Sequence, residues 1–207
     1  GCLRENDLFK NTWVIFTADH GEMLGDHHMS QKNLFFEGSA HVPLLIMPPQ
    51  GRSLPQNISV EAPTDLVDIY PTILAMAGLS SPVSVSGRNL LEPVPMDRIF
   101  FGNSLNRNFC VMEEKVKLVY SAVGDHVLLF DLNTDPMEQH NLAEDPAWQE
   151  RKAKLWKLLL EHTAQYTPEA LDEKGQFLTY EAPHFPGDVP GRWFGFHYHD
   201  YSVDTFH

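Results

Sequence analysis

The spacing of hydrophobic positions divides the chain into segments of different character. Residues 12–17 form an unbroken β-branched and aromatic run of strand length, and residues 42–47 form a second apolar run that contains Pro43. Continuous apolarity predicts a strand buried on both faces, as in the parallel sheet of an α/β protein. The proline favours an edge position, or the first residues of a strand, for the second run.

Helical and strand-like patterns follow. Residues 63–78 have helical character, with Pro71 suited to the first position of a second helical piece and Gly78 to its end. Residues 79–97 are rich in proline, glycine and serine, which indicates a boundary. Four short strand-like runs then predict an antiparallel meander; they cover residues 98–103, 109–113, 116–121 and 127–132.

An amphipathic helix is predicted after Asp145-Pro146, because aspartate is a good N-cap and proline is tolerated at the first helical position. We expect this helix to pack on the meander. The expected fold class is therefore α/β with a small antiparallel sheet and a C-terminal helix. The expected domains are an α/β portion over residues 1–97, a meander-and-helix subdomain over 98–165, and an extended aromatic and histidine-rich tail over 166–207.

Composition narrows the class of protein. The 207 residues are 43% hydrophobic, which excludes a disordered chain, and the net charge is −13. A chain this acidic is a poor general binder of nucleic acid or of anionic membranes, since both need a basic surface. No apolar run approaches the ~18–20 residues of a membrane-spanning helix. Two cysteines, Cys2 and Cys110, do not make a disulfide-rich domain.

Candidate chemistry begins where the first apolar run ends. Asp19 and His20 follow that run, and polar residues past the carboxyl end of a buried strand are where open α/β folds bind ligands. A carboxylate and an imidazole can fill two positions around a divalent cation, although capping and backbone bonding explain the same pair. Lys32 offers a point charge for an anion held by the metal, or else is a solvated surface charge.

Histidines in the loop between these residues are candidates for proton transfer. His27 and His28 follow a glycine-aspartate turn, and histidine is the residue type that titrates near neutral pH without a large shift. Either residue could equally be a loop histidine without a catalytic role.

An ordered series of motifs resembles the C-terminal half of a sulfatase, a family of the alkaline-phosphatase-like superfamily. The series spans residues 1 to about 163, and each motif is modest while their common order is specific. The motifs are Thr17-Ala18-Asp19-His20-Gly21-Glu22, Leu24-Gly25-Asp26-His27, Lys32, Phe35-Phe36-Glu37, His41-Val42-Pro43-Leu44-Leu45-Ile46, Asp68-Ile69-Tyr70-Pro71-Thr72-Ile73-Leu74, Ala77-Gly78-Leu79, Leu129-Phe130-Asp131-Leu132-Asn133-Thr134-Asp135-Pro136, Glu138 and Asn141-Leu142-Ala143.

The resemblance implies roles for individual residues. Asp19 matches a metal-binding aspartate and His20 a metal-binding position that is Asn or His in different members, and the expected ion is Ca²⁺, with Mn²⁺ or Zn²⁺ as alternatives. Lys32 matches the lysine that contacts the sulfate group, and His27 a histidine that approaches the substrate or leaving group in some members. Glu37 and His41 also match family positions, and we interpret them as loop and strand architecture.

One essential part of that family's site has no match. The nucleophile lies in a Cys/Ser-x-Pro/Ala-x-Arg motif whose Cys or Ser becomes formylglycine, and neither Cys2 nor Cys110 has an arginine four positions on. The other metal-binding aspartates also lack a match. The chain opens without Met or an N-cap, so we expect it to be a fragment whose missing N-terminal half carries formylglycine. Two metal ligands without a nucleophile predict an inactive isolated chain.

Two other readings remain open. Hydrolases of phosphonate monoesters and phosphodiesters share this half of the fold and often pair Asp with His at the metal, and a non-catalytic binding module is a further alternative. The expected partners are the missing half of the fold and a sulfated small molecule or carbohydrate. Aromatic residues of the tail (Trp193, Phe194 and Tyr198) are candidates for stacking on sugar rings, whereas its histidines (His184, His197, His199 and His207) lack the spacing of metal ligands.

Overall fold

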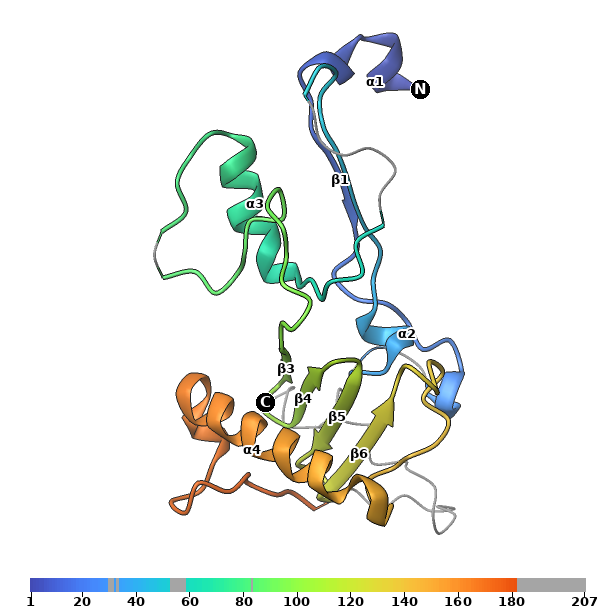
Figure 1. The fold of residues 1–207 in the computed structure, drawn as a ribbon, viewed down its shortest axis with the longest axis vertical. Coiled ribbons are helices and arrows are strands. Elements are labelled where there is room, and N and C mark those ends of the chain that lie inside the picture. The colour runs from blue at the N-terminus through green and yellow to red at the C-terminus, as the bar shows by residue number, and fades with distance from the viewer. Residues whose placement is uncertain (30–31, 33, 53–58, 83, 182–207) are drawn as a thin grey trace, which may run out of the picture. The chain divides into compact units, whose positions relative to one another are not determined.

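The computed structural model describes the whole chain except residues 30–31, 33, 53–58, 83 and 182–207 (Figure 1). The chain divides into two compact units. The first unit contains Gly1–Asp19 and Val42–Arg98, and the second contains His20–His41 and the described residues from Ile99 onward. The segment 20–41 therefore clusters with the meander, although in sequence it lies inside the predicted α/β portion.

The first unit carries a two-stranded ribbon and short helices. Its elements are α1 (Cys2–Glu5), the 3₁₀ turn η1 (Leu8–Lys10), β1 (Val14–Thr17), β2 (Leu44–Met47), the 3₁₀ turn η3 (Leu66–Asp68) and α3 (Ile69–Met76). As expected, β2 begins directly after Pro43, where the missing proline N–H breaks no ladder bond.

The predicted parallel sheet, buried on both faces, is wrong for β1. It pairs with β2 in antiparallel register, with Val14 opposite Met47 and Thr17 opposite Leu44, and among the described residues no third strand joins them. Phe16 is 61% exposed and Leu45 58% exposed, so one face of the ribbon is open. The unbroken apolar run indicated that both faces are apolar, and it contained no information about which neighbour covers them.

A buried carboxylate anchors the helical part of the first unit. Asp68 is completely buried, and its two oxygens accept hydrogen bonds from both terminal nitrogens of Arg98, at 2.5 and 3.0 Å, and from the backbone N–H groups of Arg88 and Asp65, each at 2.8 Å. Burial alone would raise the pKa of Asp68, but these donors more than offset it and hold the pKa below its usual value. The carboxylate therefore fastens η3 and α3 to the proline-rich segment 79–98.

The ends of α3 agree only partly with the pattern. Pro71 is the third residue of α3 and not its first, because η3 runs directly into the helix and supplies its first turn. Gly78 ends the helix as predicted, at a φ of +72°, and the N–H of Leu79 bonds back to the carbonyl of Leu74.

The second unit contains the predicted meander. Its strands are β3 (Phe100–Ser104), β4 (Asn108–Glu113), β5 (Val116–Ser121) and β6 (His126–Asp131). They pair antiparallel in the order β3-β4-β5-β6, which confirms the prediction to within a few residues at each end.

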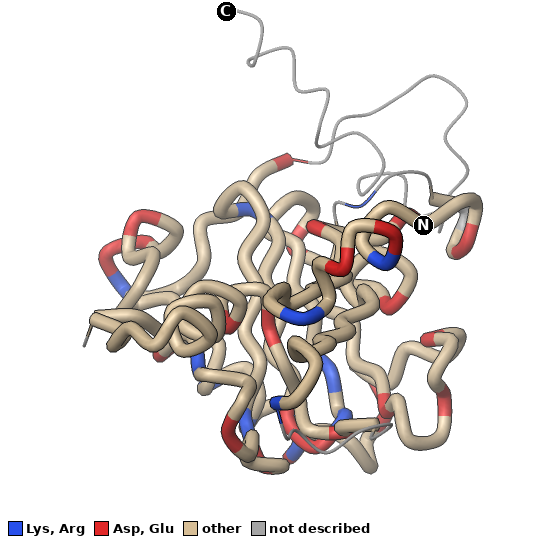
Figure 2. The backbone as a smooth tube through the Cα atoms, turned by 90° about the horizontal axis from the view of Figure 1, so that it is seen from above, with Lys and Arg blue, Asp and Glu red and all other residues tan. Residues whose placement is uncertain are grey.

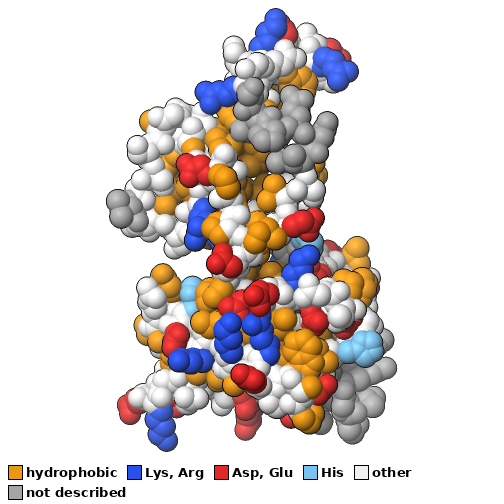
Figure 3. Space-filling view, viewed as in Figure 1, with side chains coloured by type: hydrophobic (Ala, Val, Ile, Leu, Met, Phe, Trp, Pro, Cys, Tyr) orange, Lys and Arg blue, Asp and Glu red, His pale blue; other side chains and the backbone are white. Residues whose placement is uncertain are grey.

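Helix α4 covers one face of this sheet, as predicted. The 3₁₀ turn η4 (Pro146–Trp148) leads into α4 (Gln149–Tyr166), and the Asp145 carboxylate caps the turn by accepting from the N–H of Ala147 at 2.8 Å. Leu155 and Leu159 of the helix pack against side chains from three strands; these are Phe109, Val111, Leu118, Tyr120 and Leu129. On the outer surface of α4, lysine and arginine side chains lie beside acidic ones (Figure 3), as Lys154 does with Glu113 at 2.6 Å.

The opposite face of the sheet is covered by the segment 20–41. This segment contains the 3₁₀ turn η2 (Asp26–His28) and α2 (Glu37–Ala40). Four of its side chains form a second buried cluster with strand residues of the other parity; the cluster comprises Met23, Met29, Leu34 and Phe36 together with Cys110, Val119, Leu128 and Phe130. Alternate residues of the meander therefore serve two different cores, and this is why its strands read as nearly continuous apolar runs.

The described part of the tail lies on the second unit. The 3₁₀ turn η5 (Pro168–Ala170) is followed by an isolated bridge between Leu171 and Phe177, and Phe177 is buried against Phe109 and Tyr120. The aromatic and histidine candidates of the tail lie outside the described residues; these are His184, Trp193, Phe194, His197, Tyr198, His199 and His207.

Charge and thiols add little to the architecture. Acidic and basic positions are interspersed along the backbone (Figure 2). Cys2 is exposed and Cys110 is buried, and both are free thiols. None of the helices in the described ranges is long and apolar enough to cross a membrane.

Candidate functional site

The predicted metal pair lies just past the end of β1. Asp19 is exposed and closes the first stretch of the first unit, and His20 opens the second unit with a half-buried ring. The Nδ1 atom of His20 lies 2.7 Å from the carbonyl oxygen of Gly21. Because a carbonyl only accepts, this contact requires a proton on Nδ1, and the neutral ring then has its lone pair on Nε2. That tautomer is the one in which histidine binds a metal through Nε2.

Gly21 joins this histidine to α2 by a close backbone approach. Its N–H donates to the carbonyl of Ser39 at 2.7 Å, and a Cβ atom at this position would lie 2.1 Å from the carbonyl oxygen of Gly38. Only glycine fits such a separation. The third residue of the Asp-His-Gly triplet must therefore be glycine so that the backbone next to His20 can lie against α2.

His27 occupies an unusual backbone position on the same segment. Its φ is +52°, and its half-buried ring stacks on Phe36 with a centroid separation of 4.1 Å and an interplanar angle of 15°. Phe36 in turn contacts Phe130 of the second buried cluster, with ring centroids 5.8 Å apart. A side chain in this backbone region is held only where the surroundings determine it, so the stack fixes the His27 ring against the core. The side chain of His28 lies outside the described part of the structure.

Lys32 is exposed, and its backbone is tied to α2 as well. The hydroxyl of Ser39 donates to the carbonyl of Lys32 at 2.8 Å. Ser39 is itself buried, and its own carbonyl is the acceptor for Gly21. Ser39 of α2 therefore forms hydrogen bonds with the backbone of both Gly21 and Lys32, and His27 lies between these two residues in the chain.

Beneath α2 lies a buried ion cluster, formed by Lys117, Glu37 and Glu138. The Lys117 ammonium contacts Glu37 Oε1 at 2.5 Å, Glu138 Oε1 at 2.7 Å and the carbonyl of Phe35 at 2.8 Å. Glu138 Oε2 accepts from the N–H of Glu37 at 2.7 Å. The ammonium donates hydrogen bonds to Glu37 Oε1 and to the carbonyl of Phe35, whereas its contact with Glu138 Oε1 is an ion pair without hydrogen-bond geometry, so the buried charge is paired on both sides.

The side chain of Lys117 keeps its positive charge although it is buried. Burial alone would lower the pKa of this ammonium, but the negative charges of Glu138 and Glu37 more than offset that effect and raise the pKa. Burial raises the pKa of the Cys110 thiol to about 12, so that group stays protonated beside the cluster. The cluster therefore carries a lysine cation facing two carboxyl groups.

Sequence reasoning missed Lys117. A signal was present, because it is the one charged residue in the strand run from Val116 to Ser121, and a lysine within a buried strand requires a partner. Glu37 and Glu138 belong to the motif series, but nothing in their local sequence indicates that they share one buried lysine. The structure assigns Glu37 to the ion cluster and, through its second oxygen, to an exposed contact with His41 at 2.8 Å.

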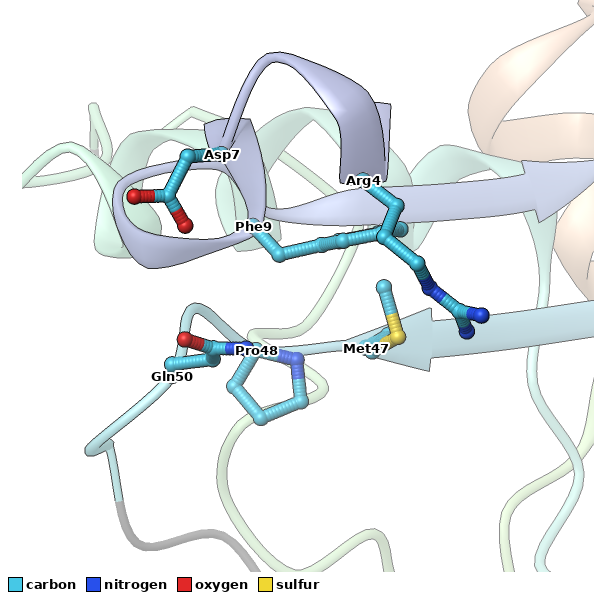
Figure 4. A pocket seen from close by; sticks show the side chains of 6 residues that line it. All are labelled: Arg4, Asp7, Phe9, Met47, Pro48 and Gln50. Atoms are coloured by element: carbon cyan, nitrogen blue, oxygen red, sulfur yellow. The ribbon is translucent and has the colours of Figure 1, made fainter. Parts of the chain in front are cut away.

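The described residues do not assemble a complete metal site. No group of three or more His, Cys, Asp or Glu side chains suited to one ion occurs among them. The small pocket shown in Figure 4 belongs to the first unit, and none of its lining residues is a predicted site residue; they are Arg4, Asp7, Phe9, Met47, Pro48 and Gln50. Asp19 and His20 are thus two candidate metal donors at adjacent chain positions, and the segment 20–41 of the second unit also carries the stacked imidazole of His27 and the exposed Lys32.

Comparison with known proteins agrees with the motif series. Residues 2–79 match the family model described as Sulfatase. The arylsulfatase K of Bos taurus is 36% identical over 161 residues, an alignment that covers 69% of this chain and 29% of the relative. The chain therefore spans about a third of the length of the curated relatives it matches.

Solved structures show the same fold. The phosphonate monoester hydrolase of Agrobacterium radiobacter is 31% identical, with a TM-score of 0.63 over 84% of this chain and 40% of that one. A protein solved in complex with its substrate D-glucosamine-2-N,6-O-disulfate is 24% identical, with a TM-score of 0.64 over 83% of this chain and 38% of that one. The fold is the α/β fold of the alkaline-phosphatase-like sulfatases. On the ordered motifs, the family match and these relatives, the chain belongs to the sulfatase family.

Proposed function

We propose that this chain contributes to a metal-dependent sulfatase that hydrolyses sulfate esters. Asp19 and His20 hold one side of a divalent cation, Lys32 contacts the sulfate group, and His27 donates a proton to the leaving oxygen. The formylglycine nucleophile and the remaining metal ligands belong to a part of the protein outside these 207 residues. The observation that supports this assignment best is the His20 tautomer, which directs the metal-binding lone pair to Nε2.

The chemistry of ester cleavage explains why such groups are needed. Breaking a sulfate ester places negative charge on the sulfuryl oxygens and on the leaving oxygen. A bound divalent cation supplies Lewis-acid stabilisation of that charge. The ammonium of Lys32 adds a second positive charge, and the imidazole of His27 acts as the proton donor to the leaving oxygen. The net charge of −13 does not prevent binding of an anion, because local cations dominate the field at the site.

A second candidate function is hydrolysis of phosphonate monoesters or phosphodiesters. The 31% identity to a phosphonate monoester hydrolase supports it. The residue at position 20 supports it as well, since imidazole suits Mn²⁺ or Zn²⁺ better than Ca²⁺, which prefers oxygen ligands. For the sulfatase reading, the complex with a disulfated glucosamine suggests sulfated carbohydrates as the substrate class.

The first experiment is to read the coding sequence directly upstream of Gly1 and to express the complete reading frame. An open frame with Cys/Ser-x-Pro/Ala-x-Arg supports the formylglycine sulfatase. The purified protein is then assayed with an aryl sulfate, an aryl phosphonate monoester and an aryl phosphodiester. Preference for the sulfate supports the proposal, preference for either phosphorus ester supports the second candidate, and no turnover of any ester in a metal-loaded protein refutes both in favour of a binding module.

Two variants test the residue roles. Lys32→Met should lower kcat/KM by about 10²–10³-fold, as loss of a single transition-state charge contact does, whereas Lys157→Met on exposed α4 is the matched control and should leave kcat/KM unchanged. His20→Asn replaces a nitrogen ligand by oxygen and should raise the affinity for Ca²⁺ relative to Mn²⁺ and Zn²⁺, which is read as bound metal per protein when the ions compete. Unaltered kcat/KM in Lys32→Met would remove that residue from the site.

A further inference from the structure

We propose that the buried cluster of Lys117 and Glu138 positions the candidate site by holding α2, and that both are positioning residues for His20 and Lys32. The inference rests on the proposed function, because it concerns the same site. It follows from a chain of contacts that begins at β5 and ends at the backbone of these two predicted site residues.

The first link is between the meander and α2. Lys117 projects from β5 on the face that the segment 20–41 covers. Its ammonium contacts Glu37, the first residue of α2, and the carbonyl of Phe35, which precedes the helix. Glu138 adds a second attachment of the helix, because its carboxylate accepts a hydrogen bond from the N–H of Glu37. Both side chains are almost completely buried, at 3% and 2% exposure, so these contacts are not exchanged for water.

The second link is between α2 and the backbone of the candidate site residues His20 and Lys32. The helix has four residues and no side-chain cap, and a helix that short has no stability of its own. Its Ser39 nevertheless bonds the backbone of Lys32 on one side and of Gly21 on the other, and Gly38 lies against Gly21 with no room for a Cβ. Whatever holds α2 therefore sets the backbone positions of His20 and Lys32 together.

The charges explain why the cluster suits this task. A buried ion pair adds little net stability compared with apolar side chains of the same volume, but it specifies one geometry, because a misplaced partner leaves a buried charge unpaired. Two hydrogen bonds and one ion pair on the Lys117 ammonium, together with the bond from the N–H of Glu37 to Glu138, restrict α2 more narrowly than apolar packing would. The apolar contacts of Phe36 and Leu34 attach the segment to the sheet, and the ion cluster sets its register.

Glu138→Gln tests this proposal in the protein expressed from the complete reading frame. Glutamine keeps the size of the side chain but has no negative charge to pair with Lys117, and one of its two polar positions is a donor and not an acceptor for the N–H of Glu37. The matched control is Leu159→Ala, which opens a cavity on the opposite face of the same sheet and does not touch α2. Both variants are studied at a temperature where circular dichroism shows them folded.

Two readouts separate positioning from general stability. Hydrogen exchange of peptides from residues 20–41 should accelerate by at least ~10-fold in Glu138→Gln, with peptides of α4 unchanged, and the reverse should hold in Leu159→Ala. The affinity for Mn²⁺ or Ca²⁺, measured by calorimetry, should fall by about 10- to 100-fold in Glu138→Gln, as for residues that orient metal ligands, and by less than ~2-fold in the control.

The outcomes are distinguishable from failure of the proposed function. Wild-type exchange over residues 20–41 in Glu138→Gln, or equal acceleration in both variants, overturns the positioning role. If the wild-type protein binds no metal and cleaves no ester, the proposed function fails while the exchange measurement still decides whether the cluster holds α2. Should Glu138→Gln not fold, the shorter Glu138→Asp, which keeps the charge but draws it back from Glu37, is measured in the same way.

Discussion

Replacing Asp68 by asparagine should destabilise the first unit severely. The carboxylate accepts four hydrogen bonds, two on each oxygen, and is completely buried. An amide has one accepting oxygen, so Asn at this position loses two of these bonds and points its own N–H groups at two other donors. Arg98, whose side chain is only 12% exposed, loses its counter-charge.

The magnitude follows from that geometry. Removing one partner of a buried ion pair costs about 3–5 kcal/mol, because an uncompensated charge remains. Two lost hydrogen bonds to a charged group, at ~1.5–3 kcal/mol each, give an overlapping range of about 3–6 kcal/mol. We therefore expect Asp68→Asn to lower the free energy of unfolding of the first unit by about 3–5 kcal/mol.

The assay is urea unfolding of the protein expressed from the complete reading frame, followed by hydrogen exchange of peptides from residues 63–78. The matched control is Asp65→Asn, the same chemical change three residues earlier, at a half-buried N-cap position where asparagine is as good as aspartate. The control should change the free energy of unfolding by less than ~0.5 kcal/mol. Equal effects of the two variants would refute the argument that the four contacts, and not the charge alone, stabilise this unit.

Acidification supplies an independent check. The pKa of Asp68 is lowered in the folded protein, so its stabilisation is fully present above the pKa of an unfolded aspartate, ~3.9, and is lost as the pH falls through the folded value. The difference between wild type and Asp68→Asn should therefore be constant near neutral pH and shrink below about pH 4. A difference that stays the same at pH 3 would contradict this linkage.

Three further results are expected. Gly21→Ala should accelerate hydrogen exchange over residues 20–41 and lower kcat/KM, because its Cβ would lie 2.1 Å from the carbonyl oxygen of Gly38; Gly1→Ala, which meets nothing within 4 Å, is the control. Asp145→Ala should cost ~0.5–2 kcal/mol of stability in urea by removing the cap of η4, and no loss would mean the cap is dispensable. Iodoacetamide should modify exposed Cys2 in the native protein and spare Cys110, whose buried thiol has a pKa of about 12; mass spectrometry of equal labelling would contradict that burial.

The candidate site was visible in the sequence only as separate motifs. Asp19, His20, His27 and Lys32 stand out because polar residues follow an apolar run in a recognisable order. Their common support did not stand out, because Lys117 is 80 residues from Glu37 and 21 from Glu138 along the chain, counting by residue number. No local pattern links residues so far apart, whereas the register of β5 and the docking of segment 20–41 bring them into contact.

The sequence by itself determined the elements whose signals are local. The four strands of the meander, the Asp145 cap, the amphipathic α4 and the stop at Gly78 depend on alternation, capping and backbone freedom, which act within a few residues. Tertiary structure alone decided the antiparallel partner of β1, the cover of the second face of the meander by the segment 20–41, and the ion cluster beneath α2. The physical reason is that apolar burial is non-directional: a hydrophobic pattern states that a face must be covered, and only the folded chain determines what covers it.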